Sequence, residues 1–152
     1  MAQQSKLTTS LSGIAGEYFV AGELSRRGYV ASLTLRNTRG IDILASNGNA
    51  TKSVGIQVKT KQGPGLDWVL NKKIEEETAT NLVYVFVRLN GLGSPEYYIV
   101  PRREVAKYAR SRHKQWLSQP RRDGKPRNDG DMRKFSDPGG KYRGRWDILG
   151  LD

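Results

Sequence analysis

Two short strand-like segments joined by a polar turn are the feature that most constrains how this chain folds. Residues 40–44 (Gly-Ile-Asp-Ile-Leu) and 55–59 (Gly-Ile-Gln-Val-Lys) each begin with glycine and continue with β-forming residues. Residues 46–52, between them, are polar and contain an Asn-Gly pair typical of a hairpin turn. The pattern predicts a β-hairpin.

The register of this hairpin brings polar side chains together. If the turn is centred near Asn49, antiparallel pairing places Asp42 opposite Gln57, because positions equidistant from the turn face each other. Gln57 and Lys59 share one face of the second strand, since side chains alternate along a strand. The other face carries Val54, Ile56 and Val58. An acid, an amide and an ammonium therefore meet on the polar face.

Composition excludes several classes of protein and site. With 152 residues the chain is expected to form one domain. It has no apolar run of the roughly 20 residues that cross a bilayer, and residues 1–6 lack the apolar core of a signal peptide, so we expect a cytoplasmic protein without membrane contact. The absence of cysteine and the single histidine, His113, exclude a Cys/His zinc cluster. Any metal is therefore expected to be a hard cation held by oxygens, and His113 to lie at the surface.

The chain is strongly basic, with a formal net charge of +11 at pH 7, and most of the excess lies after residue 100. Such a charge makes a polyanion the expected partner, although a basic surface also serves solubility.

A first helix is predicted over residues 12–27, with Gly28 after its end and Ser10 or Ser12 available as N-cap. Helical spacing gives it one apolar stripe, formed by Ile14, Tyr18, Ala21 and Leu24. Glu17 falls between two members of this stripe. It either has a buried role there, because an unpaired buried carboxylate is costly, or it lies at the edge of the stripe and points to water.

Runs of β-branched and aromatic residues predict further strands over residues 29–35, 82–87 and 97–100. Residues 36–40 are the turn into the Asp42 strand. The run 82–87 is apolar throughout and is predicted to be buried on both faces. In residues 66–80, the Trp68–Leu70 stretch can dock on the core, and residues 72–78 can form a helical turn or a mobile loop.

A second helix is predicted over residues 102–118, directly after Pro101, a residue favoured at helix starts. Its apolar face is expected to contain Val105, Tyr108, Ala109 and either Arg112 or Trp116. Residues 119–145 are rich in Gly, Pro and charge, and we expect an ordered, wrapping segment with a flexible middle, held at its far end by residues 146–151. The single domain would then have a core over about residues 10–118 and a basic segment over 119–152.

The order of these elements and polar residues resembles that of the PD-(D/E)xK nuclease superfamily. The matching residues are Glu17 in the first helix, Asp42 in one strand and Gln57-Val58-Lys59 in the next, over about residues 12–62. With Gln at the usual Glu position, the chain looks most similar to Mrr-type restriction endonucleases and their relatives near the archaeal Holliday-junction resolvases. The resemblance implies an α/β fold, a restriction-endonuclease-like domain whose mixed sheet of about five strands is flanked by helices.

The resemblance also implies an activity, that of a DNA endonuclease that hydrolyses phosphodiester bonds with Mg²⁺ or Mn²⁺. Asp42 would be the bridging metal ligand, with Gln57 binding through its side-chain oxygen and Val58 through its main-chain carbonyl. Lys59 would orient the attacking water or neutralise charge at the scissile phosphate. Glu17 would hold a metal-bound water or a second ion.

Gln57 is a departure from the superfamily pattern, because an amide cannot supply the charge of a carboxylate. Weaker metal binding is expected, and two other functions stay open: a catalytically inactive nucleic-acid-binding protein that keeps the nuclease fold, and an RNA-directed nuclease. Each residue also has a structural alternative. Asp42 would cap the turn, Gln57 would bond across the sheet, and Lys59 would pair with Asp42 or Glu17.

Basic residues in and after the second predicted helix form a candidate track for DNA phosphates. They are Arg102, Arg103, Lys107, Arg110, Lys114, Arg121, Arg122, Lys125 and Arg127. Such contacts give an affinity that falls with salt and carries little sequence information. Three aromatic residues, Trp116, Tyr142 and Trp146, are expected to pack in the core in preference to stacking on bases. The simplest way for so small a nuclease to cut both strands of a duplex is as a homo-oligomer, a dimer or higher.

Overall fold

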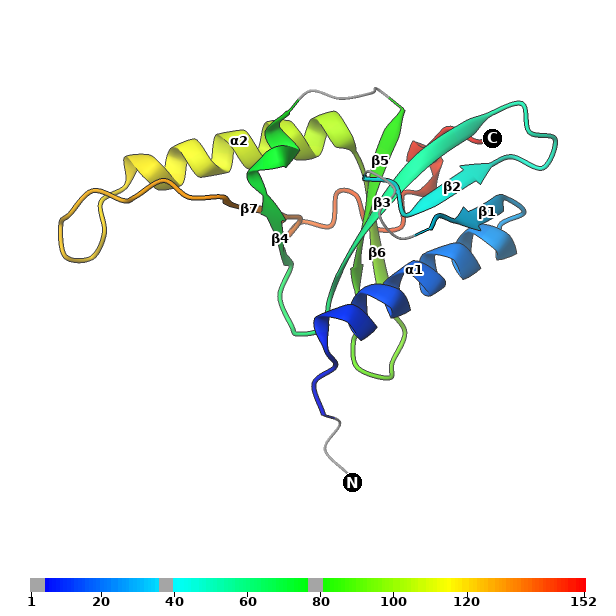
Figure 1. Ribbon diagram of the computed structural model, residues 1–152, viewed down its shortest axis with the longest axis horizontal. Coiled ribbons are helices and arrows are strands. Elements are labelled where there is room, and N and C mark those ends of the chain that lie inside the picture. The colour runs from blue at the N-terminus through cyan, green and yellow to red at the C-terminus, as the bar shows by residue number, and fades with distance from the viewer. Residues whose placement is uncertain (1–4, 36–39, 77–80) are drawn as a thin grey trace.

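The computed structural model describes residues 5–35, 40–76 and 81–152, and Figure 1 shows how their helices and strands are arranged. In chain order the elements are α1 (Thr9–Arg26), β1 (Val30–Leu33), β2 (Ile43–Ser46), β3 (Ser53–Lys61), β4 (Asp67–Asn71), the 3-10 helix η1 (Lys72–Glu75), β5 (Leu82–Arg88), β6 (Glu96–Pro101), α2 (Arg102–Ser118), β7 (Met132–Ser136) and the 3-10 helix η2 (Trp146–Leu149). Most of the turn expected over residues 36–40, and the end of the segment 72–78, lie outside the described residues.

The main sheet has five strands in the order β1-β2-β3-β5-β6. β3 and β5 run parallel, whereas the other neighbouring pairs are antiparallel. The predicted mixed five-strand sheet flanked by helices is therefore confirmed. β5 lies inside this sheet, and Val83 to Val87 are all buried, as the unbroken apolar run predicted.

One face of the sheet packs against α1. Val54, Ile56 and Val58 of β3 join Val20 and Leu24 of α1 in one apolar cluster, so the predicted core face of β3 is confirmed. The same cluster contains three residues near residue 150, namely Trp146, Leu149 and Leu151. The segment after residue 145 is thus anchored in the core.

On the opposite face, the packing lies over β5 and β6. There α2 and a separate two-stranded ribbon, β4 paired antiparallel with β7, pack on aromatic residues of the sheet. Phe86 of β5 stacks on Phe135 of β7 with ring centroids 4.5 Å apart, and Trp68 of β4 donates a hydrogen bond to the Val87 carbonyl. The predicted docking of Trp68 is confirmed, whereas the pairing of β4 with β7 was not predicted.

The buried face of α1 differs from the predicted stripe. Its buried residues are Ser12, Gly16, Val20 and Leu24, whereas Tyr18 is 63% exposed. The expected N-cap was also wrong, because the Thr8 hydroxyl accepts the hydrogen bond from the Leu11 N–H. Small residues line the contact because the helix lies close to the sheet: a Cβ added to Gly16 would stand 1.8 Å from the Thr60 hydroxyl oxygen.

Within α2, Val105, Ala106 and Ala109 are buried, and Trp116 is 41% exposed. Of the two alternatives for the last position of the apolar face, Arg112 is therefore the less exposed one. Neither helix combines the length and the apolar composition that crossing a bilayer requires, over the part of the chain that the structure describes.

Candidate active site

The hairpin of β2 and β3 has the register that the sequence predicted. Ile43 pairs with Ile56 and Ser46 with Ser53, and the Asp42 N–H donates to the Ile56 carbonyl at 2.8 Å. Continued by one residue, this register sets Asp42 opposite Gln57. Asp42 itself lies just before β2 and not inside it, which corrects the predicted strand start.

The pairing of β2 with β3 stops at this point, while β3 continues to Lys61 beside β5. Among residues 5–35, 40–76 and 81–152, the last part of β3 thus has a strand neighbour on one side only. On the other side, the Val58 N–H donates to Asp42 Oδ2 at 2.7 Å. A strand residue directs its N–H and C=O to the same side, so the Val58 carbonyl also faces the Asp42 carboxylate.

The side chains of Gln57 and Lys59 lie on the same face of β3, both partly buried. Gly40, with φ +65°, precedes Asp42, and a Cβ added there would stand 3.8 Å from Gln57 Oε1. The amide oxygen of Gln57 is therefore directed toward the segment that carries Asp42. The structure thus places Asp42 beside Gln57 and Val58, with Lys59 on the same face of β3 as Gln57.

Two further polar residues, Tyr84 and Arg102, adjoin this group. The sequence analysis did not identify Tyr84 as part of it. Tyr84 of β5 is the neighbour of Gln57 across the sheet. Burial raises the pKa of Tyr84, the charge of Arg102 lowers it and the carboxylate of Asp42 raises it, so all three side chains lie within electrostatic reach. The strand register contained this information. Tyr84 pairs with Gln57 on the neighbouring strand, so the two side chains lie on the same face of the sheet.

Glu17 lies on α1, which packs on the other face of the sheet, and it is partly buried. Its neighbour Gly16 touches Thr60, the residue that follows Lys59. α1 therefore brings Glu17 to the section of β3 that carries Lys59, but on the face of the sheet opposite to Gln57 and Lys59. A role of Glu17 in the site stays a prediction.

The donors just before β2 and in the adjoining part of β3 are a carboxylate, an amide oxygen and a main-chain carbonyl, the types of ligand that Mg²⁺ and Mn²⁺ accept. No group of three or more His, Cys, Asp or Glu able to hold a metal occurs among residues 5–35, 40–76 and 81–152. The residues thus fit a hard cation, but with fewer charged ligands than a site built on three carboxylates.

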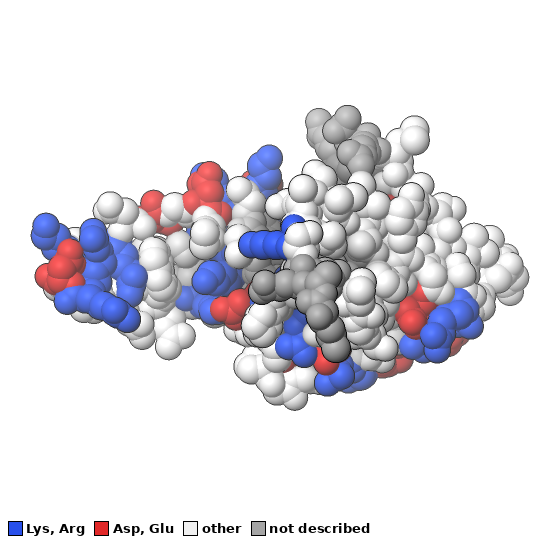
Figure 2. Space-filling view, turned by 90° about the horizontal axis from the view of Figure 1, so that it is seen from below, with Lys and Arg blue, Asp and Glu red and all other residues white. Residues whose placement is uncertain are grey.

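The residues of the predicted phosphate track occupy two different environments. Arg102 donates to the carbonyls of Glu76 at 2.7 Å and Lys73 at 3.3 Å, and Arg110 donates to the Glu75 carbonyl at 3.4 Å, so these guanidinium groups also hold η1 in place. Of the other seven members, Arg127 is partly buried and donates to the Gln119 carbonyl at 2.9 Å. The remaining six are exposed: Arg103, Lys107, Lys114, Arg121, Arg122 and Lys125. Figure 2 shows Lys and Arg side chains gathered at the end of the molecule where α2 leads into residues 119–131.

Comparison with known proteins gives matches in structure only. The sequence matches no protein-family model, and no curated protein matches it. Among solved structures, the chain is similar to a bacterial homing endonuclease, I-Ssp6803I, with a TM-score of 0.57 and 14% sequence identity over 95% of this chain and 94% of that one. It is also similar to Hjc, a Holliday junction resolvase from the archaeal hyperthermophile Archaeoglobus fulgidus, with a TM-score of 0.52 and 15% identity over 92% and 97%. At such low identity the likeness is one of fold.

Proposed function

We propose that this chain, which has the restriction-endonuclease-like fold, is a metal-dependent DNA endonuclease that hydrolyses phosphodiester bonds. The observation that carries the proposal is the hairpin register, which sets Asp42 opposite the Gln57-Val58-Lys59 segment where β2 ends and β3 continues. Both structural neighbours are nucleases by name, and each aligns over more than nine-tenths of this chain.

Each residue has a distinct part in the proposed reaction. Asp42, Gln57 and the Val58 carbonyl would hold Mg²⁺, which supplies positive charge where the phosphoryl group becomes more negative. The Lys59 ammonium would orient the attacking water or neutralise the scissile phosphate. Glu17 would position a water molecule beside them.

Two properties of the whole protein belong to the same proposal. The basic surface after residue 100 supplies contacts to DNA phosphates. A chain with one such site cuts two strands most simply as a homodimer, since a two-fold axis presents two sites to one duplex.

The first test is nicking of a supercoiled plasmid in Mg²⁺, Mn²⁺ or EDTA by the wild type, Asp42→Asn and Lys59→Ala. Asp42→Asn retains an oxygen that accepts the Val58 N–H, so it removes charge without breaking this contact. Lys61→Ala, on the same strand and the same face, is the matched control. We expect nicking in Mg²⁺ or Mn²⁺, a loss of roughly a hundredfold or more in the two site variants and little change in the control.

The variant Gln57→Glu separates weak metal binding from inactivity. A third carboxylate should lower the Mg²⁺ concentration that gives half-maximal nicking. Absence of nicking by the wild type and by Gln57→Glu in either metal, with DNA binding retained, would contradict the nuclease and identify an inactive DNA-binding protein.

A further inference from the structure

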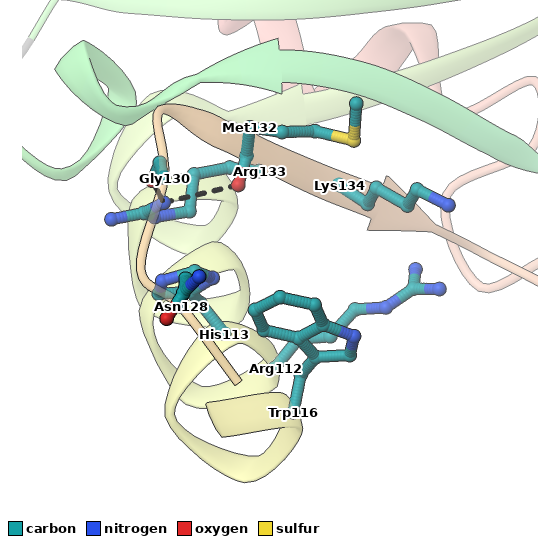
Figure 3. A pocket seen from close by; sticks show the side chains of 8 residues that line it. All are labelled: Arg112, His113, Trp116, Asn128, Gly130, Met132, Arg133 and Lys134. Atoms are coloured by element: carbon teal, nitrogen blue, oxygen red, sulfur yellow. Dashed lines mark hydrogen bonds between the residues drawn. The ribbon is translucent and has the colours of Figure 1, made fainter. Parts of the chain in front are cut away.

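A pocket of about 330 Å³ lies between the C-terminal half of α2 and β7, away from the candidate active site (Figure 3). Its walls come from three segments. α2 contributes His113 and Trp116, the loop that follows contributes Asn128 and Gly130, and β7 contributes Met132 and Lys134. A volume of this size is at the lower end of the range for small-ligand sites, roughly 300–1,000 Å³.

Trp116 forms an aromatic wall of this pocket and is held in place from behind. Trp116 is 41% exposed, whereas Trp68 and Trp146 are 2% and 6% exposed. The His113 ring stacks on the indole with centroids 5.6 Å apart and an interplanar angle of 22°. His113 is fixed in turn by Asp129, at 2.7 Å, and its side chain is only 12% exposed, which corrects the expectation of a surface histidine.

Met132 and Lys134 lie across the opening from Trp116, as Figure 3 shows. Met132 is 59% exposed on β7, although a thioether of this size is usually packed. A flexible thioether opposite an indole leaves a slot for a flat, apolar-faced group.

The cations around the slot divide into two kinds. Arg112 donates twice to Asp67, at 3.2 Å each, and Arg133 pairs with Glu75 at 2.6 Å, so both are already neutralised. Arg127 instead lies over the Trp116 ring, 4.7 Å from its centroid, and donates to the Gln119 carbonyl at 2.9 Å, a contact that leaves its positive charge in place. Lys134 is exposed at the rim. These two cations are the ones placed to meet an anion beside the slot.

We propose that this pocket binds one unpaired nucleobase of a DNA strand, stacked on Trp116, with the adjoining phosphates on Arg127 and Lys134. Asn128 offers an amide to the edge of the base. A base within a paired stack has both of its faces covered by neighbouring bases, so only an unpaired base can stack on Trp116. This inference deepens the proposed function, on which it rests for the nature of the ligand.

A base stacked on Trp116 is expected to bind the indole more strongly than Arg127 does at present. Loss of a base–aromatic stack lowers affinity roughly five- to a hundredfold, whereas loss of an exposed cation–π pair lowers it by no more than about fivefold. Arg127 would exchange the ring for a phosphate, so that its charge remains satisfied.

The distance of the pocket from the candidate active site also indicates which nucleotide of the strand would enter it. From Arg102, beside the candidate active site, to Trp116, α2 rises roughly 20 Å at about 1.5 Å per residue. That length corresponds to about six nucleotides along one strand of B-form DNA. The unpaired base would thus lie several nucleotides from the bond to be cut.

The test is binding in EDTA, where no cleavage occurs, to a labelled duplex with one bulged thymine and to the fully paired duplex. We expect the wild type to prefer the bulged duplex by roughly five- to a hundredfold. Trp116→Ala should lose this preference and keep its affinity for the paired duplex, with Trp116→Phe in between. Tyr18→Ala, which removes an exposed aromatic ring from α1, is the control and should keep the preference.

Three outcomes would overturn the proposal: no preference in the wild type, an unchanged preference in Trp116→Ala, or an equal loss for both duplexes. Competition by dTMP as strong as that by a bulged strand would also overturn it, because the ligand would then be a free nucleotide. Asp42→Asn separates this proposal from the nuclease. It should lose nicking and keep the preference, so either proposal can fail without the other.

Discussion

At the scale of single residues, the contact between Gly16 and Thr60 positions the site as much as any polar group does. The helix α1 reaches β3 at this point because Gly16 has no side chain. Glu17 and Lys59 are the chain neighbours of the two contacting residues. A change of one atom at Gly16 is therefore transmitted to both.

We expect Gly16→Ala to destabilise the fold although alanine is the better helix former. The helix gains up to about 1 kcal/mol, but an added Cβ would stand 1.8 Å from the Thr60 hydroxyl, and such overpacking costs about 1–3 kcal/mol. Gly22→Ala is the matched control, since no heavy atom lies within 4 Å of its added Cβ, and it should stabilise. Urea midpoints measure both. Equal stabilisation by the two substitutions would refute the close contact, and Gly16→Ala should also reduce nicking.

At the scale of elements, three arginines from two elements hold the 3-10 helix η1. Arg102 and Arg110 of α2 donate to its carbonyls, and Arg133 of β7 pairs with the Glu75 side chain. Arg133 is buried, with 6% of its side chain exposed, and Glu75, at 2.6 Å, is the nearer of the two carboxylates that compensate its charge. The β4–β7 ribbon and α2 are thereby joined beside the polar face of the sheet.

Glu75→Ala should lower the free energy of unfolding by about 2 kcal/mol, because the buried Arg133 loses its closest carboxylate. Glu75→Gln should cost less, since it keeps an oxygen that accepts the hydrogen bond. Glu76→Ala is the control: this exposed residue offers only its carbonyl to Arg102, and its substitution should stay within about 0.5 kcal/mol. Denaturant unfolding gives all three values, and similar values for Glu75→Ala and Glu76→Ala would disprove the role of the ion pair.

The elements also show which parts of the structure could be predicted from sequence. The pairing of Asp42 with Gln57 follows from alternation and one local turn, and both signals lie within 20 residues. The pairing of β4 with β7 joins segments about 65 residues apart, and no local pattern specifies it. The buried face of α1 was misassigned because Ser12 and Gly16 face the sheet through close approach, which apolar periodicity does not detect.

At the scale of the whole molecule, basic side chains are concentrated at the end where α2 meets residues 119–131 (Figure 2). Removing this segment would be a poor test of its role. The chain continues from it into β7 and the buried residues of η2, so a truncation would disrupt the core as well. Charge substitutions within the segment are the appropriate experiment.

The double substitution Arg121→Ala and Arg122→Ala should reduce the salt dependence of DNA binding. Each lost phosphate contact lowers the slope of log K against log[salt] by about 0.9. Arg26→Ala with Arg145→Ala removes the same charge from two exposed residues elsewhere, and its slope should match the wild type. Affinities between 50 and 200 mM salt provide the measurement, and equal slopes for the two double variants would refute the assignment.

The packing of α1 against residues 146–151 has a consequence for how the protein matures. Val20 and Leu24 share their cluster with Trp146, Leu149 and Leu151, which the ribosome adds more than 120 residues later. The core on that side of the sheet cannot close before residues 146–151 have been synthesised, because a contact so distant along the chain has to wait for its second partner. The proposed endonuclease would thus assemble only once residue 151 has emerged from the exit tunnel, and the first 145 residues would pass through synthesis without a finished cutting site.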